Sequence, residues 1–198
     1  MASRTEKAPA LDVSGRREEM LRLTLRFVAV VLAYSMAVSA HYGLAPGPFY
    51  FLLLLGDPPV LAGVAFAVFL ARGPVRLWLA VALVAYLVLA TVAFGDLAAS
   101  RMHIAALKPL GSKAGWSIAA CANMVSLYAT LFAARFLPQR PLQHTLGRIS
   151  IGLFVAASIG FVVARWIRLT PPLVPFFNAC LFIIPAGYLF EVTGRPRH

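Results

Sequence analysis

The sequence predicts an all-α membrane protein, a polytopic bundle of about six transmembrane helices with short loops and both termini in the cytoplasm. The chain of 198 residues is 61% hydrophobic, and its charged residues make up 13%, about half the fraction that is usual in a soluble domain. Apolar runs of roughly 20 residues, the length that crosses a bilayer, recur along the chain. A soluble fold of this size would leave much of that apolar surface in water, because small domains bury only a modest fraction of their surface.

The formal net charge of +11 indicates a membrane partner rather than nucleic acid. The basic residues flank the apolar runs, where such residues set the topology and contact anionic head groups. No polar segment alternates basic and aromatic residues, so no stacking surface for nucleic acid is expected. The expected partners are the lipid bilayer and either the chain itself or another membrane protein, and the expected location is the plasma (inner) membrane.

Residues 1–22 carry mixed charges and predict a polar N-terminal tail that leads into a short interfacial helix, capped by Ser14. The first span is expected at 23–44. An alternative is a signal peptide with its apolar core at 27–38 and cleavage after Val38-Ser39-Ala40. Four acidic residues in the preceding tail, together with an apolar run of spanning length, favour an uncleaved helix over the signal peptide.

Five further apolar runs predict spans at 49–71, 77–94, 114–136, 146–169 and 173–190, and with the first they form one membrane domain at 23–192. Turns that contain proline separate most of these runs, and Pro175 and Pro185 within the last run predict a kink. Gly152 and Gly160 in the fifth run are typical of positions where helices approach closely. Residues 193–198 form a short basic tail.

The longest polar connection is 95–113, in which Leu97, Ile104, Leu107 and Leu110 are spaced to predict a short helix on the membrane surface. With a cytoplasmic N-terminus, thirteen of the eighteen Lys and Arg residues fall on the cytoplasmic side. This imbalance favours six spans, because positive charge gathers on the cytoplasmic side of membrane proteins. The five basic residues left outside are Arg101, Lys108, Lys113, Arg165 and Arg168.

The segment Gly56-Asp57-Pro58-Pro59 interrupts the second run, and Asp57 is the only charged residue in that run. An acidic residue followed by two prolines predicts a discontinuous span with an ionisable group in the membrane, as in many functional sites. The other interpretation is a helix start, with Asp57 as the capping residue and Pro58 at the first helical position. Thr170-Pro171-Pro172 precedes the sixth run in the same form. The two interpretations are compatible, because a discontinuous helix has a capped end inside the membrane.

Several polar residues fall at a similar depth, about 10–14 Å below the outer interface at 1.5 Å per residue. They predict an outer-leaflet polar layer, and Asp57 and Arg165 are expected to pair within it. The alternative is structural: hydrogen bonds between helices, and an arginine that extends to the interface. The candidates for catalysis are Asp57, Cys121 and Arg165, and the candidates for ligand binding are Arg101, His103, Lys108, Asn123 and Asn178.

Cys121 and Cys180 allow three interpretations: a nucleophile at Cys121, a disulfide between the two, or two small buried hydrophobic residues. Neither cysteine belongs to a metal-ligand spacing, and the four histidines are scattered along the chain. No metal or other cofactor is therefore expected.

No HExxH, GxSxG or P-loop motif is present, and few acidic residues follow the N-terminal tail, which leaves little for general acid–base chemistry. The leading hypothesis is non-enzymatic: a small membrane subunit or transporter-like protein that acts through helix packing and the outer-leaflet polar layer. The alternative is a membrane-embedded enzyme that acts on an outer-leaflet lipid or lipid-linked substrate.

Overall fold

The protein is α-helical wherever its structure is described. A computed structural model describes residues 13–42, 49–166 and 173–194, and this part of the chain contains no strand. The expected all-α class is therefore confirmed for these residues. The elements in chain order are α1 (Val13–Tyr42), α2 (Phe49–Leu70), α3 (Gly73–Arg101), the 3₁₀ helix η1 (Ala105–Gly111), α4 (Lys113–Arg135), α5 (Pro141–Trp166) and α6 (Leu173–Val192).

Three helical stretches within the described residues are long and apolar enough to cross a membrane: Gly73–Ser100, Lys113–Arg135 and Pro141–Ala164. Pro58–Leu70 and Ala179–Val192 are shorter apolar helical stretches. A helix satisfies its own backbone hydrogen bonds, which a segment in hydrocarbon must do. The chain is thus a membrane-embedded helical protein, while the number of six spans and the side of the termini remain predictions.

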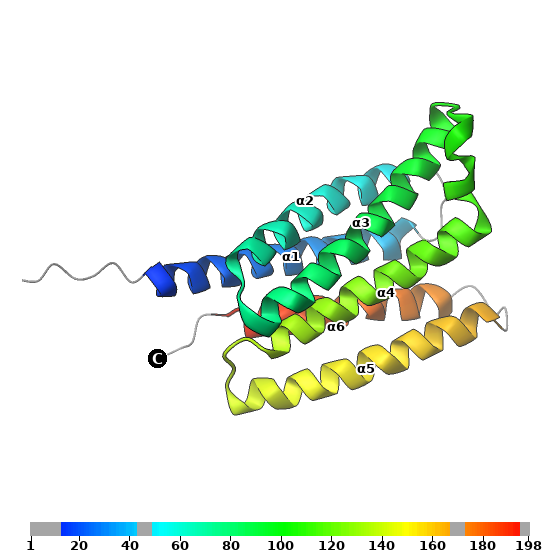
Figure 1. Ribbon diagram of the computed structural model, residues 1–198. Helices are drawn as coiled ribbons and strands as arrows, with labels where there is room; N and C mark the ends of the chain where they lie inside the picture. The colour runs from blue at the N-terminus through cyan, green and yellow to red at the C-terminus, as the bar shows by residue number, and fades with distance from the viewer. Residues whose placement is uncertain (1–12, 43–48, 167–172, 195–198) are drawn as a thin grey trace, which may run out of the picture.

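Five of the helices form a closed ring in which α1 contacts α2, α2 contacts α3, α3 contacts α4, α4 contacts α6, and α6 returns to α1. Helix α5 packs on α6 and, over a smaller area, on α4 (Figure 1). Successive helices run in opposite directions, so the start of α1, the end of α6 and the turns after α2 and α4 lie together. We call this the terminal end of the bundle, and the opposite end, which carries η1, the η1 end.

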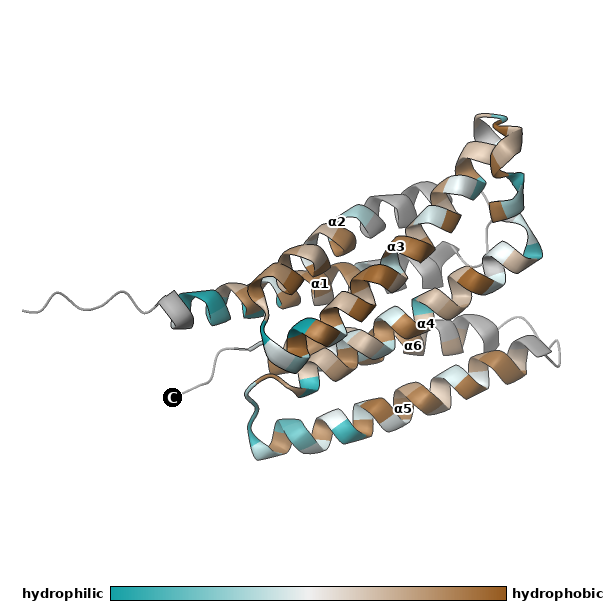
Figure 2. Cartoon of the chain, in the orientation of Figure 1, coloured by the Kyte–Doolittle hydropathy of each residue, from teal (hydrophilic) through white to brown (hydrophobic). Residues whose placement is uncertain are grey.

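Apolar side chains fill the interior and also cover the outside of the bundle. Leu25 of α1, Leu79 of α3, Leu127 of α4, Phe154 of α5 and Leu181 of α6 are fully buried. Figure 2 shows hydrophobic colouring along the length of the helices and hydrophilic colouring at the start of α1, before α5 and around η1. A helix that is apolar on all sides suits a lipid environment.

Close approach of helices depends on glycine at specific positions. A Cβ on Gly63 of α2 would lie 2.7 Å from Cγ2 of Val28 on α1, and one on Gly160 of α5 would lie 2.5 Å from the ring of Phe177 on α6. The expectation for Gly160 is therefore confirmed. At Gly152 a Cβ would meet no described atom within 4 Å, so no described helix of this chain approaches there, and its expected role at a helix interface stays a prediction.

Helix α2 runs from Phe49 to Leu70 with Pro58 and Pro59 inside it. The interpretation of a helix that starts at Pro58 is therefore wrong, and so is that of a span divided at this point. A proline has no N–H for the carbonyl four residues earlier, so the carbonyls of Leu54 and Leu55 lose their helical donors. Neighbouring groups commonly satisfy such carbonyls in a transmembrane helix, which explains why a proline pair does not have to end it.

The predicted surface helix within 95–113 is also wrong. Its first part is the end of α3, which continues to Arg101. The chain then turns at His103, whose φ is +55°, and η1 packs back on both α3 and α4. Leu110 lies directly against Gly95 of α3, so its apolar side chain is used in packing between helices rather than on a membrane surface.

Candidate functional site

The order of the helices places the residues of the predicted polar layer in one half of the bundle. Asp57 lies in the first part of α2, Cys121 and Asn123 in the first part of α4, and Arg165 at the end of α5. Helices α2, α4 and α6 begin at the η1 end and α5 finishes there (Figure 1). Asn178, near the start of α6, belongs to the same half. This common depth agrees with the expectation, but a joint site of these residues stays a prediction.

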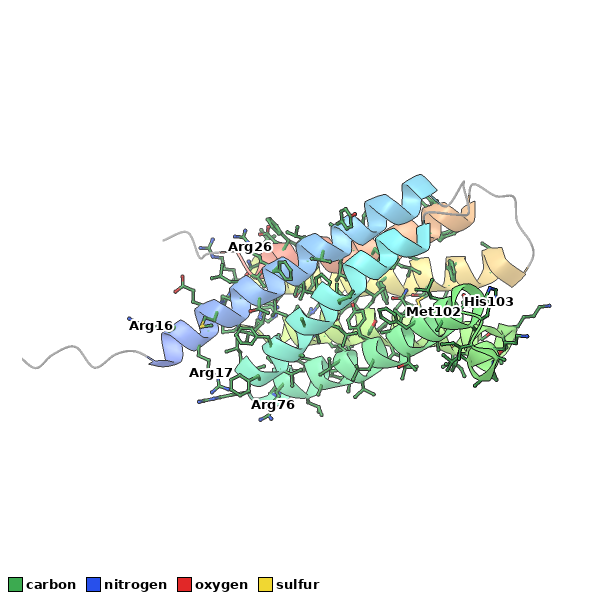
Figure 3. All side chains as sticks on the ribbon, turned by 90° about the horizontal axis from the view of Figure 1, so that it is seen from above. Arg16, Arg17, Arg26, Arg76, Met102 and His103 are labelled. Carbon is green, nitrogen blue, oxygen red and sulfur yellow. The ribbon has the colours of Figure 1, made fainter. Side chains whose placement is uncertain are left out.

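The side chains of Asp57, Arg165, Asn178 and Arg101 lie outside the described part of the structure. Among the other candidates, Cys121, His103 and Lys108 are exposed and Asn123 is half-buried. Figure 3 shows His103 with Met102 at the η1 end. The described residues contain no group of three or more His, Cys, Asp or Glu side chains that could hold a metal ion.

The state and exposure of the two cysteines contradict two of the three interpretations. Cys121 and Cys180 are both free thiols, so the disulfide interpretation is wrong. Cys121 is exposed and Cys180 is half-buried, so Cys121 is not the small buried hydrophobic residue of the third interpretation. A nucleophilic role for Cys121 stays a prediction.

A polar cavity of about 930 Å³ lies at the terminal end of the bundle, opposite to the predicted polar layer. Three helices and the turn between α4 and α5 contribute its walls. Its lining is mainly charged or amide side chains: Glu18, Arg22 and Arg26 of α1, Pro138, Gln139 and Arg140 of the turn, Gln143 of α5, and Phe190, Glu191 and Gly194 at the end of α6 and beyond it.

Arg22 connects α1 to two other elements of the cavity. Its Nη1 donates a hydrogen bond to the carbonyl of Val192 at 3.0 Å, and its Nη2 donates to the carbonyl of Pro138 at 3.1 Å. Its Nη2 also lies 2.9 Å from Oε1 of Glu18 in an ion pair four residues apart on the same helix. Because the last carbonyls of a helix have no helical donor and carry partial negative charge, this guanidinium stabilises the end of α6.

The α4–α5 turn is held to α6 by amide side chains. The backbone N–H of Arg140 donates to Oε1 of Gln143 at 2.9 Å, an arrangement typical of a helix start with glutamine at its third position. Nε2 of Gln143 donates to the carbonyl of Glu191 at 3.3 Å. The hydroxyl of Tyr188 donates to Oε1 of Gln139 at 3.1 Å, and Nε2 of Gln139 donates to the carbonyl of Ala134. The cavity therefore has a fixed wall opposite α1.

Arg26 lies against an aromatic ring at the wall of the cavity. Its guanidinium carbon lies 4.4 Å from the centre of the Phe190 ring, where a cation is attracted by the aromatic face. Its Nε is buried and has no hydrogen-bond partner within the described structure. Figure 3 shows Arg26 where α1 passes the end of α6. Nε of Arg26 is therefore a buried donor without an acceptor among the described residues.

This cavity was not predicted from the sequence, because basic residues at the ends of apolar runs are also explained by membrane topology alone. A usable signal was present: Glu18, Arg22 and Arg26 are spaced four residues apart and share one face of a helix. Such a face directed at the bundle would have indicated a polar pocket between α1 and its neighbours.

No protein-family model, curated protein or solved structure matches this chain.

Proposed function

We propose that this chain is a multi-pass protein of the plasma (inner) membrane, with six spans and both termini in the cytoplasm, that acts as a membrane subunit. In this proposal α5 packs against a helix of a second copy or of another membrane protein. The observation that carries the proposal is the position of α5, which contacts only α6 and α4 among the described helices. Of its most apolar stretch 17% is buried, against 50% for α4.

The outer face of α5 has the composition of a helix-packing surface. Ile149, Leu153 and Ile159 are exposed, and Gly152 and Ala156, four residues apart, are exposed between them. Small residues at this spacing let the backbone of a second transmembrane helix approach closely, and contact between the two helices then stabilises association in lipid. A span that served only to cross the membrane would not need this pair.

The other hypotheses depend on different residues. A transporter-like role for the outer-leaflet polar layer, and an enzyme acting on an outer-leaflet lipid, both need Asp57 and Arg165 in a common site. The side chains of these two residues lie outside the described part, so both hypotheses remain predictions. The exposed face of α5 favours the subunit role over them.

The test is Gly152→Leu, with Ala65→Leu on the exposed part of α2 as the matched control. Two differently tagged copies of the chain are expressed together, and recovery of one tag with the other is measured together with the native mass. We expect Gly152→Leu to lose association at least tenfold and Ala65→Leu to retain it. A stoichiometric partner other than a second copy, lost in the same variant, would also support the proposal. A monomeric wild-type chain without a partner, or equal association of both variants, would contradict it.

A further inference from the structure

A smaller cavity, of about 290 Å³, lies at the terminal end where α1 passes the turn between α2 and α3. Three of its lining residues are charged, namely Arg17, Glu18 and Arg72, and we call it the Arg72 cavity. Four of its apolar lining residues are buried: Leu21, Leu70, Val75 and Leu137. Apolar walls with a few polar groups are typical of small-molecule sites, and this volume is near the lower limit of their range. A small ligand is therefore expected.

The Arg72 cavity is surrounded by protein on its sides and opens at the end of the bundle. Its walls come from α1, the end of α2, the start of α3 and the residues that follow α4. The four helices are consecutive members of the ring, and the hydrogen bond from Arg22 to Pro138 joins α1 to the chain after α4. The lining residue Arg72 is exposed. A ligand would therefore enter from the aqueous side of the terminal end.

Arginine is in excess around the Arg72 cavity even when both glutamates of α1 are counted. Glu18 lines the cavity, but Nε and Nη2 of Arg22 both donate to its Oε1, at 3.0 and 2.9 Å. Within 15–22 and 70–78, which the structure describes throughout, the charged residues are five arginines and two glutamates: Arg16, Arg17, Arg22, Arg72, Arg76, Glu18 and Glu19. This surplus attracts an anion.

Two arginines supply hydrogen-bond donors at the cavity. Arg17 is held in place by its bonds to the carbonyls of Leu70 and Phe69, which leave three of the five N–H donors of a guanidinium. The negative end of the α2 dipole offsets part of the charge of Arg17. The side chain of Arg72 makes no hydrogen bond or ion pair with any residue of the described structure. Arg72 is therefore the main attraction for an anion, and Arg17 is an oriented donor beside it.

We propose that the Arg72 cavity binds a small amphiphilic anion from the aqueous side, with its anionic group on Arg72 and Arg17 and its apolar chain against Leu21, Val75 and Leu137. The planar fork of a guanidinium matches two oxygens of a carboxylate or phosphate. The apolar chain is stabilised because it leaves water for the apolar lining. The site uses neither α5 nor its exposed face, so it is independent of the proposed subunit role.

The experiment measures binding of octanoate to the purified full-length chain by isothermal titration calorimetry. The chain is held in nanodiscs of dioleoylphosphatidylcholine, and empty nanodiscs are the blank. Acetate lacks the apolar chain and octanamide lacks the charge, so each is expected to bind at least tenfold more weakly than octanoate. Arg72→Gln is expected to weaken octanoate binding roughly tenfold, as for loss of a charged hydrogen-bond donor. Arg148→Gln is the matched control, because Arg148 is exposed near the start of α5 and does not line the cavity.

Several results would overturn the proposal. Octanoate that releases no heat beyond the blank, or that binds no better than acetate or octanamide, would exclude an amphiphilic anion. Equal weakening by Arg72→Gln and Arg148→Gln would indicate attraction to the basic end as a whole. Dioleoylphosphatidylglycerol is the membrane source of the same chemistry, and native mass spectrometry measures its binding. Loss of that lipid in Arg72→Gln but not in Arg148→Gln would assign the cavity to the bilayer.

Two further variants keep the test independent of folding. Arg72→Lys retains the charge without the planar fork, so its affinity for octanoate is expected between those of wild type and Arg72→Gln. Phe136 lines the cavity and is 49% exposed, so Phe136→Ala is expected to weaken octanoate binding several-fold. Leu142→Ala, at an exposed residue outside the lining, is expected to bind as wild type does. Equal affinity of the Phe136 and Leu142 variants would contradict the apolar part of the site. The melting temperature without ligand shows that each variant is folded.

Discussion

The guanidinium of Arg17 on α1 donates hydrogen bonds to the last turn of α2, from Nε to the carbonyl of Leu70 and from Nη2 to the carbonyl of Phe69, each at 2.7 Å. These carbonyls lie where a helix has no N–H donors of its own and where its dipole is negative. Arg17 is therefore a cap for α2 supplied by a different helix. Arg22 likewise donates to Val192 at the end of α6 and to Pro138 in the α4–α5 turn. The two arginines make α1 the element that holds the terminal end together.

Replacing Arg17 by methionine is expected to destabilise the protein by about 1–2 kcal/mol, the range for hydrogen bonds from a partly exposed charged donor. The melting temperature in detergent measures the effect. Arg16→Met is the matched control, because Arg16 is the exposed neighbour on the same helix (Figure 3). If the two variants melt at the same temperature, Arg17 does not cap α2.

A glycine fixes the distance between α5 and α6 beside the cavity. A Cβ on Gly147 would lie 2.8 Å from Cζ of Tyr188, whose hydroxyl donates to Gln139. Gly147→Leu is expected to displace the Tyr188 ring, break this hydrogen bond and lower stability by about 1–3 kcal/mol, as overpacked interiors do. Chemical denaturation in mixed micelles measures the loss.

Gly152→Leu is the control for Gly147→Leu on the same helix. A Cβ on Gly152 meets no described atom within 4 Å, so the stability of the isolated chain is expected to stay within about 0.5 kcal/mol of wild type. An equal loss in both variants would contradict the contact with Tyr188 as the cause, because replacing a helical glycine by leucine otherwise favours the helix. The same Gly152 variant is the one expected to lose association between chains.

The helices were predictable because an apolar segment in lipid must satisfy its own backbone. Helix α2 begins at Phe49 and α6 at Leu173, as the apolar runs indicate. The ends of α3 were not predictable in this way: it extends from Gly73 to Arg101, well beyond the apolar run 77–94. A charged residue marks where a span leaves the hydrocarbon, but the helix continues as long as its backbone bonds form.

The cavity at the terminal end was less predictable than the helices. The contact of Arg17 with Leu70 joins residues 53 positions apart, and that of Arg22 with Val192 joins residues 170 positions apart. Whether an arginine faces lipid head groups or the carbonyls of another helix depends on which helices are neighbours. No local pattern of apolar and basic residues contains that information.

The connection between α3 and α4 depends on close packing around Leu110. A Cβ on Gly115 of α4 would lie 2.8 Å from the backbone carbonyl carbon of Leu110, and one on Gly95 of α3 would lie 3.0 Å from its Cβ. A backbone atom cannot move aside as a side chain does, so Gly115→Ala is expected to displace η1 from α4. Hydrogen exchange of the amides in 104–112 is expected to become at least tenfold faster.

The control for Gly115→Ala is Gly187→Ala in α6, where a Cβ meets no described atom within 4 Å. Exchange in 104–112 is expected to match wild type in this variant. Unchanged exchange in Gly115→Ala would show that η1 is held by contacts other than the one with α4. Faster exchange across all helices would instead indicate loss of the whole fold.

The proposed topology places the two ends of α3 on opposite sides of the membrane. Arg76 in its second turn is exposed at the terminal end, and His103, just after α3, is exposed at the η1 end (Figure 3). In a chain with Cys121→Ala and Cys180→Ala, His103→Cys in intact cells is expected to react with a membrane-impermeant maleimide added outside. Arg76→Cys is expected to react only after the cells are opened, because thirteen of eighteen basic residues assign its end to the cytoplasm. The reverse pattern would invert the orientation, and labelling of both positions from outside would exclude α3 as a span.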